Sequence, residues 1–208
     1  MGYSHTMKIL TVADRVVPDL LRPHNPLNIT APYLILGCGD LPPEYLTQLR
    51  ERFNVPVFYV RGNHDIRHPA TPPIGCTNLD MRIERYQGLR FMGLEGSRWY
   101  NGGPFQYSES QMRRRLARMR PKIWWYRGID VVVTHAPPRH VQDQEDRCHR
   151  GFNTLNRLIA ACAPRYLIHG HIHRHFEDGI ERVTQVNQTK VVNSYGFWQF
   201  DIETDRSV

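Results

Sequence analysis

Along this chain, polar side chains that can bind metal ions follow one apolar, strand-like segment after another. They are Asp14, Asp40, Asn63, His135, His171 and His173. A single His after a strand is more often structural, but packing alone does not explain six such residues at five strand ends. The carboxyl ends of parallel strands meet at one edge of a sheet, where open α/β folds place their chemistry. The recurrence therefore predicts a layered α/β fold with one site at that edge.

The spacing of apolar residues predicts two sheets. In the first half, strands over 8–13, 33–36 and 55–60, with a helix between the second and third, form a unit with parallel strands. A hairpin that joins 81–86 to 89–92 through a Gln-Gly turn predicts a second, less parallel sheet.

The second half continues the alternation of strands and helices. Ser108 and Gln111 form the capping box of a helix over 108–120, and Pro121 is expected to end this helix. We further expect strands over 131–133 and 166–168, a helix with an apolar stripe from Leu155 to Cys162, and a closing strand pair formed by 191–193 and 197–202.

Length and composition predict one domain that folds without disulfides. The 208 residues suffice for a sizeable core, and we expect a single domain over 7–208. The four Cys are scattered without a C-x-x-C pair, and no apolar segment is long enough to span a bilayer, which favours a cytoplasmic protein. Residues 1–6 carry no pattern and precede a second Met at Met7, so we expect an extension that is disordered or derived from cloning.

The segment 60–65, Val-Arg-Gly-Asn-His-Asp, has the composition of a loop that performs chemistry. Gly62 permits a sharp turn, and Asn63 offers a neutral oxygen ligand. His64 can carry a proton near neutral pH, and Asp65 can hold its imidazole in one tautomer. An ordinary turn is the alternative, because Gly and Asn are common turn residues.

The candidate ligands are oxygen and nitrogen donors without thiolate, a set that suits Mn²⁺, Fe²⁺ or Zn²⁺. Their number is also compatible with two ions that share one carboxylate. The series of motifs resembles that of the calcineurin-like metallophosphoesterases, in the same order and over most of the chain. The motifs are Asp14, Gly39-Asp40, Gly62-Asn63-His64-Asp65, Thr134-His135 and Gly170-His171-Ile172-His173.

The resemblance implies a four-layer αββα sandwich, in which two mixed sheets are flanked by helices, with a site for two divalent metal ions. One ion would be bound by Asp14, Asp40 and His173, and the other by Asp40, Asn63, His135 and His171, with Asp40 as the bridge. The implied reaction is hydrolysis of a phosphate ester by attack of a metal-bound hydroxide. His64, oriented by Asp65, would protonate the leaving oxygen or stabilise charge on the phosphoryl group.

Two positions depart from the family pattern. The first motif is usually D-x-H, and Val16 replaces the His, which weakens the first site but leaves it three protein ligands. Pro43 replaces a usual polar residue and affects the support of its loop more than ligation. Arg15 is a candidate for substrate binding, because a guanidinium beside the first ion can bind phosphate. A solvent-facing Arg is the alternative at this position.

Three further segments have candidate roles. His149 and Arg150, which follow the His135 loop, are candidates for contact with the substrate. The glycine-rich, aromatic segment 93–106 either lines a cleft or covers the core. The Arg-rich helix over 108–120 is either a contact for nucleic acid or a solvated face.

The formal net charge of +7 favours an anionic partner. A phosphorylated small molecule, either a phosphodiester or a phosphomonoester, is the expected substrate, because the short chain leaves little room for a recognition domain. Nucleic acid is an alternative partner, and membrane insertion is not expected. A non-catalytic scaffold is an alternative function, since the small subunit of retromer uses this fold as an interaction platform. The presence of His64 favours an enzyme, because a scaffold needs no proton donor.

Overall fold

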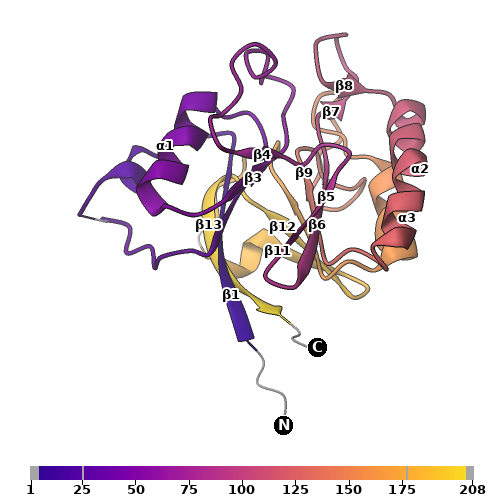
Figure 1. Ribbon diagram of the computed structural model, residues 1–208. Coiled ribbons are helices and arrows are strands. Elements are labelled where there is room, and N and C mark those ends of the chain that lie inside the picture. The colour runs from indigo at the N-terminus through magenta and orange to yellow at the C-terminus, as the bar shows by residue number, and fades with distance from the viewer. Residues whose placement is uncertain (1–4, 25, 177, 205–208) are drawn as a thin grey trace.

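Two sheets pack face to face, because alternate side chains of their strands are buried on opposite faces. The computed structural model describes residues 5–24, 26–176 and 178–204. In β1 (His5–Ala13), Ile9 faces the cluster between the sheets and Leu10 faces the opposite side. In β9 (Val131–Thr134), Val131 faces the same central cluster and Val132 faces away from it. Helices cover both outer faces, which confirms the predicted four-layer sandwich (Figure 1).

The first sheet contains the predicted parallel unit. Its order is β13 (Gly196–Thr204), β1, β2 (Leu34–Gly37), β3 (Val57–Tyr59) and β4 (Thr77–Asn78). The strands from β1 to β4 are parallel, and β13 is antiparallel to β1. Helix α1 (Pro43–Phe53) covers the outer face with Tyr45, Leu46 and Leu49. A 3-10 helix, η1 (Pro18–Leu21), follows β1.

The second sheet contains the predicted hairpin. Its order is β11 (Val183–Val186), β12 (Thr189–Asn193), β10 (Tyr166–His169), β9, β6 (Leu89–Leu94) and β5 (Ile83–Tyr86). The four central strands are parallel, whereas β5 and β11 are antiparallel to their neighbours. Helices α2 (Glu109–Trp125) and α3 (Asn153–Cys162) cover the outer face. The remaining elements are η2 (Ile180–Arg182) and the small sheet of β7 (Ser97–Arg98) and β8 (Gln106–Tyr107).

Helix α2 begins as predicted and ends later than predicted. Ser108 Oγ accepts from the backbone N–H of Gln111, and Gln111 Oε1 accepts from the N–H of Ser108, which completes the capping box. The expectation that Pro121 ends the helix is wrong, because α2 continues to Trp125. Pro121 is exposed and removes one backbone hydrogen bond, while Met119 and Ile123 on either side pack into the core. Packing of the buried face therefore outweighs the local cost of the proline.

The end of the chain also differs from the expectation. Strands β12 and β13 do not pair with each other, because β12 lies beside β10 in the second sheet and β13 crosses to β1 in the first. The register of β13 extends to the start of β1, where His5 and Thr6 pair with Thr204 and Glu203. These two residues of the segment 1–6 therefore belong to the sheet, and residues 1–4 lie outside the described chain. Among the described residues, every helix is too short or too polar to cross a membrane.

Candidate metal centre

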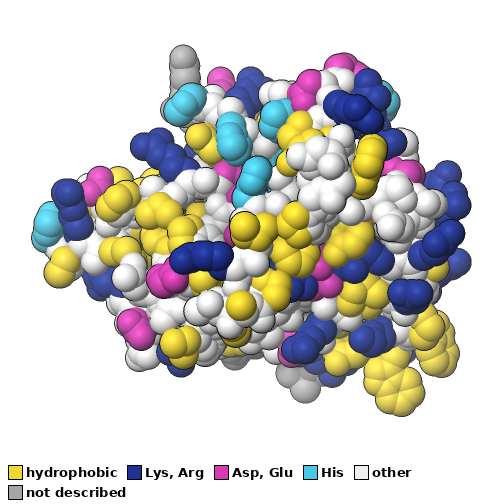
Figure 2. All heavy atoms as spheres, turned by 90° about the horizontal axis from the view of Figure 1, so that it is seen from above, with side chains coloured by type: hydrophobic (Ala, Val, Ile, Leu, Met, Phe, Trp, Pro, Cys, Tyr) yellow, Lys and Arg dark blue, Asp and Glu magenta, His cyan; other side chains and the backbone are white. Residues whose placement is uncertain are grey.

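The predicted ligands come together at one edge of the sandwich. Parallel strands of both sheets end there, and the loops that leave β1, β2, β3, β9 and β10 carry these residues. Figure 2 looks down on this edge and shows His side chains and an acidic side chain gathered near its middle. The convergence needs both sheets, since three of the loops leave the first sheet and two leave the second.

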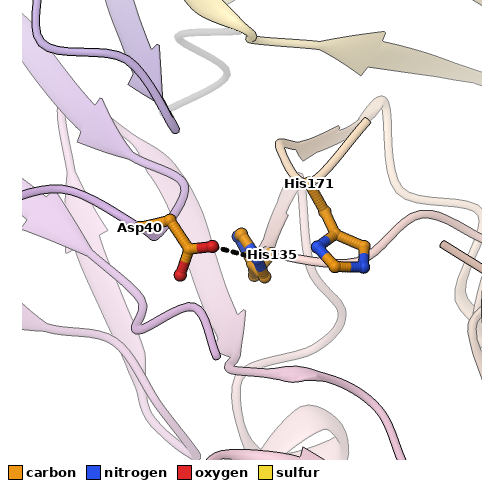
Figure 3. Close-up of side chains that lie close together, drawn as sticks. All are labelled: Asp40, His135 and His171. Carbon is orange, nitrogen blue, oxygen red and sulfur yellow. Dashed lines mark ion pairs between the residues drawn. The ribbon is translucent and has the colours of Figure 1, made fainter. Parts of the chain in front are cut away.

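Three side chains form a cluster that can hold a cation. Asp40, His135 and His171 each offer a ligand atom, and these atoms lie within 4.8 Å of one another (Figure 3). His135 Nε2 lies 3.3 Å from Asp40 Oδ2 and 3.2 Å from Asn63 Oδ1. The four residues predicted to bind the second ion are thus brought together around one imidazole.

The ligands predicted for the first ion are adjacent to this cluster. Asp14 has a fully buried side chain, and its Oδ1 lies 3.4 Å from His173 Nε2. The backbone N–H of His171 donates to both oxygens of the Asp14 carboxylate, at 2.9 and 3.1 Å. Asp14 therefore links the end of β1 to the loop that carries both imidazoles. Val16 is 40% exposed and offers no ligand atom.

Hydrogen bonds to backbone carbonyls orient the two buried imidazoles. Nδ1 of His135 donates to the carbonyl of Cys38 at 2.8 Å, which directs Nε2 toward Asp40. Nε2 of His171 donates to the carbonyl of Cys148 at 3.0 Å, which leaves Nδ1 free for the cluster. Partners of this kind select the tautomer of a metal ligand in many metalloproteins.

The electrostatics of the cluster also fit a cation. Burial opposes the charged form of His135, but the neighbouring Asp40 carboxylate outweighs it and raises the pKa of His135 to about 10. Burial likewise opposes ionisation of Asp40, yet the charge of His135 holds the pKa of Asp40 well below its usual value. Burial, and then the charge of His135, lower the pKa of His171 to about 3. The Asp40 carboxylate thus favours a positive charge beside it, which a metal ion can supply in place of the proton of His135.

The backbone of the site is held in an uncommon conformation. Asp14, Asp40 and His171 have φ values of 61°, 55° and 67°, in the left-handed region that non-glycine residues seldom adopt. Each such residue costs about 1–3 kcal/mol and persists only where the surroundings enforce it. The motif glycines allow the close approach, because a Cβ at Gly62 would lie 2.0 Å from Asp40 Oδ1. Three of the candidate ligands are thus among the non-glycine residues of the described chain that have a positive φ.

Asp65 has different partners from those expected. Its carboxylate accepts from the backbone N–H groups of Asp40 at 2.8 Å, Leu41 at 3.0 Å and Gly62 at 2.7 Å. The buried His68 lies 3.4 Å from the same carboxylate, and burial raises the pKa of Asp65. These contacts join the loop after β2 to the loop after β3. Among the described contacts, Asp65 therefore supports the backbone of these two loops rather than the imidazole of His64.

His64 lies at the open side of the cluster. Its backbone N–H donates to Asp40 Oδ1 at 2.8 Å, and its side chain is exposed. A hollow of about 220 Å³ lies beside it, lined by Asp40, Leu41, Pro42, Pro43, His64, Asp65, Arg67 and His68. The imidazole can therefore meet a ligand that enters from solvent.

The loop that precedes α3 covers the other side of the cluster. The ring of His149 lies 5.2 Å from that of His171 and 6.4 Å from that of His173. Its Nδ1 lies 2.9 Å from a carboxylate oxygen of Asp146, which is not among the site residues predicted from the sequence. The D-x-x-H spacing of Asp146 and His149 is the sequence signal that could have identified this contact. Arg150 donates to the carbonyl of Glu145 and is exposed, as is Arg15.

Aromatic side chains complete the surroundings of the site. The hydroxyl of Tyr100 accepts from Asn63 Nδ2 at 3.2 Å, so the segment 93–106 reaches the cluster. Tyr195 stacks on His173 with 4.9 Å between ring centroids. Tyr195 is not among the site residues predicted from the sequence, and no local pattern marks it.

Comparison with known proteins identifies the family. The family model of the calcineurin-like phosphoesterases matches residues 7–175. The chain belongs to this family. A comparison with the curated proteins gives no match. Members of this family typically bind divalent metal ions, and Asp40, His135 and His171 form a group of possible ligands for such an ion.

Solved structures with low identity share the fold of the whole chain. TT1561 of Thermus thermophilus has a TM-score of 0.67 at 14% identity, over 97% of this chain and 100% of that one. The calcineurin-like phosphoesterase YfkN from Bacillus subtilis has a TM-score of 0.59 at 12% identity, over 98% and 86% of the two chains. GAP50, the anchor in the inner membrane complex of Plasmodium, has a TM-score of 0.50 at 12% identity, over 90% and 71%. At these identities the likeness concerns the fold alone.

Proposed function

We propose that this protein is a metal-dependent phosphoesterase that hydrolyses a small phosphodiester or phosphomonoester. The observation that supports the proposal is the convergence of Asp40, Asn63, His135 and His171 at one sheet edge, with His64 beside them. A carboxylate, an amide oxygen and two oriented imidazoles are suitable ligands for Mn²⁺, Fe²⁺ or Zn²⁺.

The ligands divide into two sets that share Asp40. Asp40, Asn63, His135 and His171 would bind one ion, and Asp14, Asp40 and His173 the other. Ions bound there would neutralise the charge of the phosphate and activate water for in-line attack. The second set has one imidazole fewer than the family pattern because Val16 offers no ligand atom, so we expect its ion to bind more weakly.

The remaining residues position the substrate and move a proton. His64 is exposed beside the hollow and is fixed through its backbone to Asp40, so its imidazole can donate a proton to the leaving oxygen. Asp65 keeps both loops in register through three backbone N–H groups. Arg15 on one side, and His149 and Arg150 on the other, would contact the phosphate or its substituent.

Hydrolysis of bis-p-nitrophenyl phosphate and p-nitrophenyl phosphate tests the proposal. Protein treated with EDTA should be inactive, and Mn²⁺ should restore activity. His64→Ala should lower kcat by about 10²–10⁴-fold while Mn²⁺ still binds in calorimetry. His24→Ala, which changes an exposed His elsewhere, is the matched control and should retain full activity.

The scaffold alternative predicts a different result. GAP50 is described as an anchor and shares this fold, so the fold alone does not require catalysis. Folded wild-type protein that binds Mn²⁺, Fe²⁺ or Zn²⁺ and hydrolyses neither substrate would support the scaffold. Activity that is equal in wild type and His64→Ala would instead contradict the assigned proton donor.

A further inference from the structure

The outer face of α2 carries a row of cations. Those on the helix are Arg113, Arg114, Arg118, Arg120 and Lys122, and Arg127 follows its end. All six are exposed, and within 5–24, 26–176 and 178–204 none of them forms an ion pair. The acidic residue of the helix, Glu109, accepts from the backbone N–H of Thr154 at the start of α3 and faces inward. Like charges so placed repel one another, so this face favours an anionic partner.

Two indole rings extend the same face. Trp124 is 79% exposed and Trp125 is 75% exposed, because α2 continues past Pro121. At about 100° per residue, Trp124 lies in line with Arg113 and Arg120, and Trp125 lies in line with Arg114 and Arg118. Figure 2 shows Lys and Arg along the right-hand edge, the side on which Figure 1 places α2, and large hydrophobic side chains that project at the lower right. Two lines of guanidinium groups thus run along the outer face, and each indole continues one of them.

Two hollows lie at this face. One, of about 220 Å³, is lined by Tyr107, Gln111, Arg114, Arg115 and Arg118. The other, of about 410 Å³, lies at the carboxyl end of α2 between the β5–β6 hairpin and the helix, and its lining includes Arg85, Arg90, Tyr126 and Arg127. Arg115 and Arg90 are ion-paired with Asp80 and Asp130, so the guanidinium groups left for phosphate oxygens are those of Arg114 and Arg118 in the first hollow and of Arg85 and Arg127 in the second. Phenol rings beside them suit flat aromatic rings.

The composition of the face distinguishes between two anionic partners. Elements that bind at a membrane surface combine Trp with aliphatic or Phe side chains that enter the lipid. Apart from the two Trp, the exposed apolar residues of α2 are the small Ala117 and Pro121. Single-stranded nucleic acid instead requires a track of cations with exposed rings on which bases can stack. The 17 residues of α2 extend about 25 Å, enough for several consecutive phosphates.

We propose that the outer face of α2, with the two adjoining hollows, binds single-stranded nucleic acid. Arg and Lys side chains along the helix would contact the phosphates, and Trp124 and Trp125 would stack on bases at its carboxyl end. The contacts are to the backbone and to ring faces, so binding depends little on base sequence. This surface does not include the candidate metal ligands and does not depend on the proposed reaction.

Fluorescence anisotropy with a fluorescein-labelled single-stranded 20-mer tests the proposal. EDTA in the buffer prevents hydrolysis and separates this test from the metal site. We expect binding that weakens steeply as salt increases, with a slope of log K against log salt near −0.7 for each phosphate neutralised. Trp124→Ala/Trp125→Ala should weaken binding by at least about tenfold, and Trp fluorescence of the wild type should be quenched by the oligonucleotide.

Charge substitutions provide the second measurement and its control. Arg114→Gln/Arg118→Gln should weaken binding and reduce the salt slope by about 1.4, which is the effect of two phosphate contacts. Arg22→Gln/Arg50→Gln removes the same charge from exposed positions beside and on α1, and should leave the salt slope unchanged. All substituted side chains are exposed, so we expect each variant to retain the thermal midpoint of the wild type within about 2 °C.

Three results would overturn the proposal. The first is no binding of the oligonucleotide at low salt, or binding that the two variants of α2 leave unchanged. The second is binding to vesicles of phosphatidylserine and phosphatidylcholine without binding to the oligonucleotide, which would assign the face to a membrane. The third is a dimer in sedimentation that Trp124→Ala/Trp125→Ala dissociates, again without binding to the oligonucleotide.

Discussion

Replacing Gly62 by Ala tests the close approach of two loops at the candidate metal centre. A Cβ at this position would lie 2.0 Å from Asp40 Oδ1, 2.6 Å from Asp40 Cγ and 2.7 Å from the Asp40 nitrogen. Favourable contacts between carbon atoms begin at about 3.5 Å, so Asp40 must move by more than about 1 Å. Asp65 Oδ2 accepts from the N–H groups of both Gly62 and Asp40, so neither loop can retreat without losing a hydrogen bond.

The displacement of Asp40 should strongly reduce metal affinity and the rate of hydrolysis, and should reduce the stability of the fold less. Bonds between metal and oxygen tolerate about 0.2 Å, and changes around metal ligands cost about 10–100-fold in affinity. A shift of about 1 Å at a reacting group costs about 10²-fold in rate. We therefore expect Gly62→Ala to bind Mn²⁺ about 10–100-fold more weakly and to hydrolyse bis-p-nitrophenyl phosphate about 10²-fold more slowly. Overpacking should lower the free energy of unfolding by about 1–3 kcal/mol.

Three measurements on Gly62→Ala and one control decide the matter. Calorimetry with Mn²⁺ gives the affinity, the chromogenic diester gives kcat, and urea unfolding gives the stability. Gly103→Ala is the matched control, because the nearest atom to its Cβ is the end of the flexible Gln106 side chain, at 2.8 Å. Affinity for Mn²⁺ within twofold of the wild type in Gly62→Ala would refute the reasoning, since Asp40 would then not need its present position.

Three further predictions concern charge and backbone. Asp65→Asn should destabilise the protein by about 1–3 kcal/mol in urea, because one amide oxygen replaces a carboxylate that binds three N–H groups; an unchanged midpoint would contradict this. Burial opposes ionisation of Asp130, but hydrogen bonds from Arg90 outweigh it and lower its pKa, so this stabilisation is present above about pH 4 and is lost below it. The Tm difference between wild type and Asp130→Asn should therefore shrink below about pH 4, and a constant difference would exclude the ion pair as its cause. Pro121→Ala supplies an N–H for the carbonyl of Ala117 and should raise stability by about 1–3 kcal/mol, or about 2–4 °C in Tm per kcal/mol; a lower Tm would show that the proline is favourable here.

The predictions for regular elements followed from local periodicity. The continuous apolar run of Leu34, Ile35 and Leu36 predicts a strand, and the structure places these residues in a strand whose two faces contact different core clusters. The capping box at Ser108 is also a local signal, and α2 begins there. Such signals are contained within a few residues of sequence, so a strand or a helix start can be predicted from them without knowing which other element packs against it.

The incorrect predictions concerned choices among partners. The apolar pattern of 197–202 indicates a strand but does not say whether it pairs with 191–193 or with β1 at the other end of the chain. Pro121 is a local stop signal, and the burial of Met119 and Ile123 overrides it. Asp65 follows His64 in sequence, but its carboxylate points to the backbone of another loop.

The sequence by itself determined the family, the layered fold and the residue types that stand at the strand ends, because motif spacing and hydrophobic period are local properties of the chain. Only the tertiary structure decided which of these side chains meet, that Asp146 lies against His149 near the cluster, and that Trp124 and Trp125 remain exposed beside a row of cations. The physical reason is that contact and exposure depend on which surfaces the sheets and helices cover when they pack, and residues far apart in the sequence decide that jointly.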